Sequence, residues 1–221
     1  MFSAIAPRYD LLNRLLSLTI DRSWRRRAVD RLGWERQPGG TFLDACAGTL
    51  DLATELARRS GFRGRVVATD FALPMLRLGA AKPPLGTVRS AVADTLALPL
   101  AGSSVDGAMV GFGVRNLAGL NDGLAELARV LRPGARLVVL DFTTPSNAAL
   151  RWLYLLYFRR VLPLVGRLVS GHPSAYTYLP ASVMDFPPPP ELERRMHEAG
   201  FRESGHELLT GGIAAVTWGV R

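Results

Sequence analysis

The chain has 221 residues, of which 48% are hydrophobic and 21% are charged, and its formal net charge at pH 7 is +8. This length is enough to bury the core of one domain but short for two, so we expect a single domain over residues 1–221. One cysteine, Cys46, excludes a disulfide framework, and the three histidines are too widely spaced to predict a metal site. The sequence shows neither a signal-peptide pattern nor a membrane-spanning run, so we expect a cytoplasmic protein.

The first 36 residues have the periodicity of helices. Apolar side chains recur at helical spacing through Leu11, Leu12, Leu15, Leu16 and Ile20, and the pattern resumes at Trp24, Ala28 and Leu32. A break near Thr19 separates the two stretches. We therefore predict two short helices that form an N-terminal extension, residues 1–36, ahead of the main fold.

From Thr41 onward, short apolar runs alternate with helical segments. The runs are TFLDACA, RVVATD, TVRSAVAD, VDGAMVGFG and ARLVVLDF, and helices are predicted between them at 51–59, 74–81 and 120–131. Continuous apolar strands that alternate with helices indicate a parallel sheet covered on both faces. Near the end of the chain, a short helix after the proline run is followed by HELLTGG and IAAVTWGV, which predict a hairpin at one edge of the sheet.

The predicted architecture is a doubly wound α/β fold with a mostly parallel, seven-stranded sheet and an antiparallel edge hairpin. Residues 146–186 interrupt the alternation of strands and helices with the apolar runs LRWLYLLYF and VLPLVGRLV. In a doubly wound sheet, ligands bind at the carboxyl ends of the strands. We therefore interpret residues 146–186 as an insertion that covers an active site at that edge.

The predicted strand ends carry a set of carboxylates. Asp70 ends the second strand, 22 residues after Gly48, where an acid can accept hydrogen bonds from both hydroxyls of a ribose. Asp94 ends the third strand, where the amino group of an adenine could donate to it. Each acid alone is equally well explained as a cap of the turn that follows. Together with Asp44 at the end of the first strand, they favour a nucleoside ligand.

The turn in LDACAGTLDLA distinguishes between nucleoside cofactors. A dinucleotide site needs several glycines and a helix N-terminus without an acid, because the backbone must approach a pyrophosphate. Here Gly48 is the only glycine, Leu50 stands where a further glycine is expected, and Asp51 begins the helix. S-adenosylmethionine has a ribose and an adenine, and its sulfonium and ammonium groups are cationic. An acid-lined turn therefore favours S-adenosylmethionine.

The chain also resembles a known family over nearly its whole length. The segments that carry the resemblance are IAPRYDLLNRLLSLTIDRSWRR, LDACAGTLDLA, TDFALPMLRLG, GFGVRN, RVLRPGARLVVLDF, YFRRVLPLVG, SGHPSAYTYLPASV and LTGGIAAVTWG. In this order they resemble the ubiquinone/menaquinone biosynthesis C-methyltransferases, and within that family the demethylmenaquinone methyltransferases. The resemblance implies a Rossmann-like class I methyltransferase that uses S-adenosylmethionine to convert demethylmenaquinol into menaquinol during menaquinone (vitamin K2) biosynthesis.

The resemblance also implies a cofactor site. The residues that it assigns to S-adenosylmethionine are Gly48, Thr49, Asp70, Asp94 and Thr95. Leu50 departs from the family, in which smaller residues are usual at this position. If the turn needs a positive φ there, leucine costs on the order of 1 kcal/mol or more, and we expect weaker cofactor binding.

Methyl transfer to a ring carbon requires the quinol hydroxyl to lose its proton, so the site must stabilise a developing oxyanion. Arg115 of GFGVRN is our candidate for this catalytic role, and Asn116 is predicted to orient it. The alternative for Arg115 is a structural ion pair with Asp141. Tyr9 and Tyr176 are predicted to bind the substrate by lining the pocket of the quinol ring, with simple packing as the alternative.

The positive charge is concentrated in two segments. Residues 1–36 hold eight arginines against four acidic residues, and residues 148–170 hold four arginines and no acid. Trp, Tyr and Leu are interleaved with the arginines of the second segment. This pattern predicts peripheral contact with the anionic inner face of the cell membrane, in which a prenylated quinol resides. Packing on the sheet, or against a second copy of the chain in a homodimer, is the alternative.

Other functions stay open from the sequence. A methyltransferase acting on nucleic acid or on another small molecule would share the same core. The insertion is apolar, whereas a surface that binds the phosphates of a nucleic acid is polar. We therefore expect no nucleic-acid partner. The chain could also be a non-catalytic relative that binds a quinone or a nucleoside and whose cofactor turn has lost its function because of Leu50. The presence of Thr49, Asp70 and Asp94 argues against this alternative.

Overall fold

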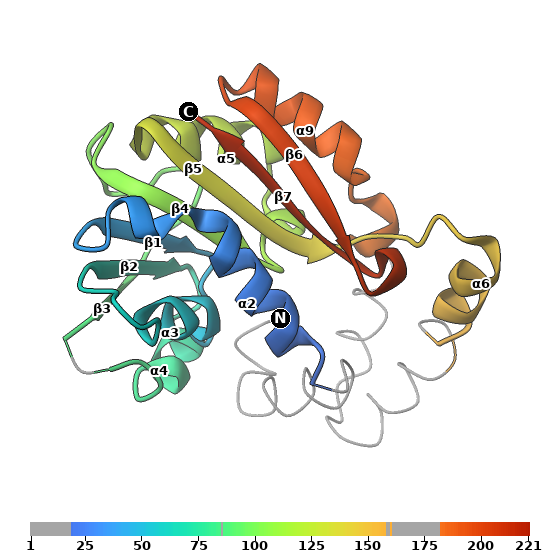
Figure 1. The fold of residues 1–221 in the computed structure, drawn as a ribbon, viewed down its shortest axis with the longest axis horizontal. Coiled ribbons are helices and arrows are strands. Elements are labelled where there is room, and N and C mark those ends of the chain that lie inside the picture. The colour runs from blue at the N-terminus through green and yellow to red at the C-terminus, as the bar shows by residue number, and fades with distance from the viewer. Residues whose placement is uncertain (1–18, 85, 158–159, 161–181) are drawn as a thin grey trace.

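Seven strands form one mixed sheet in the computed structural model, which describes residues 19–84, 86–157, 160 and 182–221 (Figure 1). The strands are β1 (Thr41–Ala45), β2 (Arg65–Asp70), β3 (Val88–Val92), β4 (Val105–Gly111), β5 (Leu131–Phe142), β6 (Arg202–Leu209) and β7 (Ala214–Val220). They lie in the order β3–β2–β1–β4–β5–β7–β6, and β7 pairs antiparallel with both of its neighbours. The predicted doubly wound fold with an antiparallel edge hairpin is confirmed.

Helices connect and cover these strands. They are α2 (Asp21–Leu32), α3 (Asp51–Ala57), α4 (Leu73–Gly79), α5 (Leu120–Val130), α6 (Ala148–Leu156) and α9 (Pro189–Glu198), with short 3₁₀ turns η1 (Trp34–Arg36), η2 (Val114–Asn116) and η4 (Thr210–Gly212). The three helices predicted between strands are confirmed to within about two residues, the usual uncertainty of helix ends. β5 begins at Leu131, directly after α5 and ahead of the RPGA turn, because Leu131 pairs with Val105 before the register shifts.

The sheet has an apolar core on each face, which explains why the strands are apolar without alternation. On β1, Phe42 belongs to the core beneath α2 and α3, whereas Leu43 belongs to the core beneath α5 and α9. Val138 and Val139 of β5 divide in the same way. This two-residue period is that of a strand, and Figure 1 shows the sheet between these helices.

Helix α2 is part of one of these layers. Trp24, Ala28 and Leu32, the predicted apolar stripe, are all buried against the sheet. The indole Nε1 of Trp24 donates to Thr210 Oγ1 at 2.8 Å, which ties α2 to the far end of the chain. Thr19, where the break is predicted, has a φ of 65°. The second half of the predicted extension therefore belongs to the core, while its first helix lies outside the described residues.

The insertion begins with α6. Its N-cap residue Asn147 accepts a hydrogen bond from Leu150 N at 3.1 Å, and Tyr154 of this helix is buried. Residues 158–159 and 161–181 lie outside the described part, so the covering role of 146–186 stays a prediction. Among the described helices, none combines the length and the apolar character needed to cross a membrane.

In the turn between β1 and α3, Leu50 takes the place of a glycine. Leu50 has a φ of 64° and a ψ of 28°, the left-handed conformation that glycine normally supplies. Its side chain is almost completely buried in the core rather than turned into solvent. Gly79 of α4 makes the room, because a Cβ there would lie 2.4 Å from the Thr49 carbonyl oxygen and 2.7 Å from Leu50 Cγ. Burial of the leucine offsets the strain of its backbone.

We predict that Leu50→Gly destabilises the protein even though it relieves the strained φ. Loss of a buried leucine side chain costs about 2–5 kcal/mol, whereas the relieved strain returns about 1–2 kcal/mol. The matched control is Leu50→Ala, which loses the packing but keeps the strain and should be about 1 kcal/mol less stable than Leu50→Gly. Urea unfolding measures all three proteins. A Leu50→Gly protein more stable than wild type would contradict this explanation of the turn.

Candidate functional site

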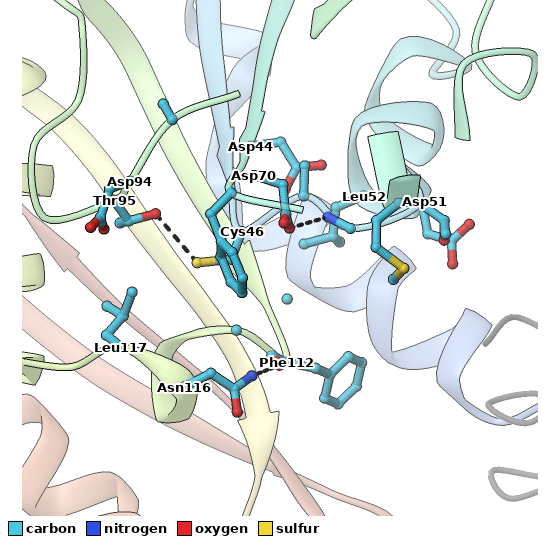
Figure 2. Close-up of a pocket in the computed structure, with 18 of the residues that line it drawn as sticks. Asp44, Cys46, Asp51, Leu52, Asp70, Asp94, Thr95, Phe112, Asn116 and Leu117 are labelled. Carbon is cyan, nitrogen blue, oxygen red and sulfur yellow. Dashed lines mark hydrogen bonds between the residues drawn. The ribbon is translucent and has the colours of Figure 1, made fainter. Parts of the chain in front are cut away.

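A cavity of about 310 Å³ lies at the carboxyl ends of β1 to β4, where the strand order reverses between β1 and β4. This is the position at which doubly wound sheets bind ligands, and the volume is that of a small-molecule site. In Figure 2, Asp94 and Thr95 lie on one side, Asp51 lies on the opposite side, and Asp70 lies between them. Phe112 and Asn116 form a further wall.

Asp70 ties together two loops that line this cavity. Its Oδ2 accepts a hydrogen bond from Gly48 N at 2.8 Å, and its Oδ1 accepts one from Ala72 N at 2.8 Å. Burial raises the pKa of Asp70, and the two backbone N–H groups limit the rise. A carboxylate has about four acceptor positions, so each oxygen retains capacity for a further donor. A diol such as that of ribose matches this arrangement.

Asp44 lies in the interior wall of the cavity. Its Oδ2 accepts a hydrogen bond from Ala53 N at 2.8 Å, which joins the end of β1 to the first turn of α3. Burial raises the pKa of Asp44 to about 8, although the hydrogen bond from Ala53 acts to lower it. The neighbouring carboxylates of Asp51 and Asp70 add to the rise. Asp44 is therefore mostly protonated at neutral pH.

The loop after β3 supplies Asp94 and Thr95. Asp94 is exposed, and its Oδ1 accepts a hydrogen bond from Leu96 N at 2.9 Å, so it caps the turn as the alternative interpretation required. Its carboxylate keeps acceptor positions for an adenine amino group. Thr95 is buried, with Oγ1 3.3 Å from Cys46 Sγ. Burial raises the pKa of Cys46 to about 12, so its thiol stays protonated and forms part of the cavity wall.

Arg25 lines the cavity although nothing in the sequence analysis assigned it to the site. From α2, its Nη2 lies 3.3 Å from Asp51 Oδ2, and its Nη1 pairs with Asp21. Lys82 Nζ holds Asp51 Oδ1 at 2.8 Å. The turn is therefore less acidic than its sequence indicates, because Asp51 is paired with two cations. The i,i+4 spacing of Asp21 and Arg25 in DRSWRR predicts their ion pair, but it does not predict that Arg25 reaches the cavity.

Arg115 and Asn116 have different surroundings. Arg115 is almost fully buried and pairs with Asp141, which is the structural alternative left open by the sequence. Among the described residues, Arg115 is not one that lines the cavity. Asn116 does line it, and its Nδ2 donates to the carbonyl oxygen of Phe112 at 3.3 Å. The structure therefore brings Asn116 to the cavity and leaves Arg115 behind its wall. Their catalytic roles stay predictions.

Six of the residues assigned to the site from the sequence line this one cavity: Gly48, Thr49, Asp70, Asp94, Thr95 and Asn116. Tyr9 and Tyr176, assigned to the ring pocket, lie outside the described residues, and their roles stay predictions.

The cavity fits S-adenosylmethionine better than a dinucleotide. Asp70 and Asp94 offer acceptors for ribose hydroxyls and an adenine amino group. Asp51 occupies the first position of α3, where a pyrophosphate would otherwise bind. Gly48, with a φ of 52°, turns its N–H toward Asp70 rather than toward a phosphate.

A seven-stranded sheet of this order, with a nucleoside site at its switch point, defines the Rossmann-like S-adenosylmethionine-dependent methyltransferases. The model of the ubiE/COQ5 methyltransferase family matches residues 1–221, and the chain belongs to this family. A demethylmenaquinone methyltransferase of Thermus thermophilus is 49% identical over 223 aligned residues, which cover 100% of both chains. The ubiquinone/menaquinone biosynthesis C-methyltransferase UbiE of Geobacter sulfurreducens is 43% identical over 99% of this chain and 86% of its own.

A solved structure shows the same fold at low identity. The methyltransferase in complex with the Haloferax volcanii Trm112 methyltransferase activator has a TM-score of 0.73 and 16% identity, covering 99% of this chain and 96% of that one. The enzyme class and the cofactor predicted from the sequence are confirmed.

Asp44 makes the stability of the ligand-free protein depend on pH. Its pKa is about 8 in the folded protein and about 4 in an unfolded chain. The folded state therefore holds a proton that the unfolded chain releases between these values. The resulting stabilisation is complete below about pH 4 and is lost as the pH rises to about 8.

We predict that Asp44→Asn weakens this pH dependence, because an asparagine can still accept from Ala53 N but does not titrate. Urea unfolding midpoints of wild type and variant, measured from about pH 5 to pH 8, test it. The wild-type midpoint should fall more steeply with pH. Parallel profiles would contradict the pKa assigned to Asp44.

Proposed function

We propose that this protein transfers a methyl group from S-adenosylmethionine to a ring carbon of demethylmenaquinol, which yields menaquinol. The observation that carries this proposal is the pair of strand-end carboxylates, Asp70 and Asp94, in one cavity of a chain with this family membership. The end-to-end identity of 49% with a demethylmenaquinone methyltransferase supports the choice of substrate.

Five residues are assigned to the cofactor: Gly48, Thr49, Asp70, Asp94 and Thr95. When bound, S-adenosylmethionine supplies a methyl group on a positively charged sulfur. Asp70 would accept from the ribose hydroxyls while it keeps its two backbone donors. Asp94 would accept from the adenine amino group. Thr95, buried against Cys46, would form part of the wall behind the adenine.

The wall formed by Phe112 and Asn116 is our candidate for the contact with the quinol ring. Phe112 has a φ of 58°, which is an outlier for a bulky residue and is typical of a position under functional constraint. Its ring centre lies 4.8 Å from that of Phe142. Because the Arg25 guanidinium lies over this ring and Phe142 packs against it, we expect the flat quinol ring to meet Phe112 edge to face.

Catalysis requires the chain to favour loss of the quinol proton next to this wall. We assign the Asn116 amide, which lines the cavity, to a hydrogen bond with the quinol hydroxyl. Arg115 precedes it in η2, and its buried ion pair with Asp141 fixes the turn that presents Asn116. Because Asp141 balances the charge of Arg115, we expect the pair to act on the developing oxyanion as a fixed dipole. Tyr9 and Tyr176 stay assigned to the lining of the ring pocket.

The basic residues of α2 support a small-molecule substrate over a nucleic acid. Arg27 and Arg31 pair with Glu207 at 2.8 and 2.7 Å, and Arg25 faces the cavity. Three of the five arginines of α2 are thus engaged within the fold. A phosphate-binding surface would need such charges free to meet the backbone of a nucleic acid.

We infer that α6 meets the membrane in which the prenylated quinol resides. Trp152, Leu153 and Leu156 are 66%, 56% and 41% exposed. A helix face with tryptophan and leucine beside Arg151 suits the interface of an anionic bilayer. Such contact would place the protein at the inner face of the cell membrane. The same apolar face could instead pack against a second copy of the chain.

We predict that Asp70→Asn raises the KM for S-adenosylmethionine about 10- to 100-fold, since hydrogen bonds to a charged acceptor are worth about 1.5–3 kcal/mol. The assay is methyl transfer to a short-chain demethylmenaquinol, followed by mass spectrometry of the product. The control is Asp122→Asn, an exposed residue of α5, which should behave as wild type. A wild-type protein that methylates no demethylmenaquinol would contradict the proposed substrate.

The membrane assignment predicts that Trp152→Ala with Leu153→Ala lowers binding to phosphatidylglycerol-containing vesicles about tenfold or more, as expected for loss of buried apolar area. Leu208→Ala is the matched control, since Leu208 is 48% exposed on β6 and lies outside α6. Vesicle sedimentation measures binding. If the double variant binds as wild type but no longer forms a dimer that wild type forms, α6 is a dimer contact instead.

A further inference from the structure

The amino-acid end of S-adenosylmethionine carries a carboxylate as well as an ammonium group. The cavity that would receive it is lined by the carboxylates of Asp51, Asp70 and Asp94 and by the mostly protonated Asp44. A ligand carboxylate among these side chains would be repelled unless a cation meets it. Of the described residues that line the cavity, Arg25 alone is a lysine or an arginine.

We propose that Arg25 is the specificity residue for the amino-acid end of the cofactor, with its guanidinium binding the cofactor's carboxylate. The proposal rests on the cofactor role proposed above for this cavity, and it adds a residue from α2, outside the strand-end set. Arginine suits the task because its planar guanidinium can hold a carboxylate with two parallel hydrogen bonds.

The position of Arg25 in the cavity agrees with this role. Its Nη2 lies 3.3 Å from Asp51 Oδ2, and its guanidinium carbon lies 5.6 Å from the ring centre of Phe112. Asp51 lies on the side of the cavity opposite Asp94 (Figure 2). If adenine binds at Asp94 and ribose at Asp70, the amino-acid end extends toward Asp51 and Arg25.

The charges around Arg25 allow it to accept a ligand. Its side chain is only 11% exposed and pairs with Asp21, so the guanidinium is held in place before a ligand arrives. Nη1 and Nη2 contact Asp21 and Asp51, and each of these nitrogens carries a second N–H. Lys82 holds Asp51 at 2.8 Å independently. Asp51 therefore stays paired when Arg25 binds a carboxylate, and its remaining acceptor capacity can meet the ligand's ammonium group.

Calorimetric titration with two ligands tests the proposal without a turnover assay. S-adenosylhomocysteine has the amino-acid end, whereas 5′-methylthioadenosine lacks it. We expect Arg25→Gln to weaken binding of S-adenosylhomocysteine about 10- to 100-fold, as for loss of a charge-assisted pair. Binding of 5′-methylthioadenosine should not change. Arg27→Gln, two residues further along α2 and paired with Glu207, is the matched control and should bind both ligands as wild type does.

A second variant distinguishes loss of the contact with the cofactor from destabilisation of α2. Arg25→Gln removes the cation that pairs with the charge of Asp21, which is only 6% exposed. Asp21→Asn with Arg25→Gln removes that charge and should show the same selective loss. An equal loss of affinity for both ligands in the double variant would show that Arg25 only supports α2, which overturns the proposal. If wild type binds neither ligand, the cofactor site itself is contradicted.

Discussion

The two backbone hydrogen bonds accepted by Asp70 hold together the parts of the molecule on which ligand binding depends. They join Gly48, in the turn after β1, to Ala72, in the loop after β2, through a single carboxylate. Burial opposes the charge of this group and raises its pKa, and the two N–H groups offset part of that effect. A partly desolvated carboxylate with unused acceptor positions, set in a cavity, is a strong candidate for ligand recognition.

The turn beside Asp70 shows how the core and the site share one constraint. Leu50 keeps a left-handed backbone because its side chain is buried against the room left by Gly79. The same turn presents Gly48 to Asp70 and starts α3, whose Ala53 N–H donates a hydrogen bond to Asp44. Packing on one side of the turn therefore supports polar contacts on the other. Leu50 is not among the described residues that line the cavity, so its direct effect falls on stability.

Much of the fold and part of the site follow from local sequence patterns. Strand and helix periods predict the order of the elements, and parallel strands place their carboxyl ends at one edge of the sheet. That rule is sufficient to bring Asp70 and Asp94 together from sequence alone. The strained φ of Leu50 is also foreseeable, because the turn lacks the glycine that such a conformation favours.

The rest depends on tertiary packing that no local pattern encodes. Arg25 reaches the cavity only because Trp24 and its neighbours pack α2 on the sheet. Arg115 lies next to Asn116 in the chain, yet its ion pair with Asp141 turns it behind the wall. The raised pKa of Asp44 likewise results from burial, which the sequence of β1 does not reveal.

A crystal structure of the protein with S-adenosylhomocysteine tests the central claim most directly. The account predicts both ribose hydroxyls within about 2.6–3.0 Å of the Asp70 carboxylate oxygens, with the adenine amino group at Asp94 and the Gly48 N–H still bonded to Asp70. A ligand bound outside the cavity, or one whose ribose turns away from Asp70, would contradict it.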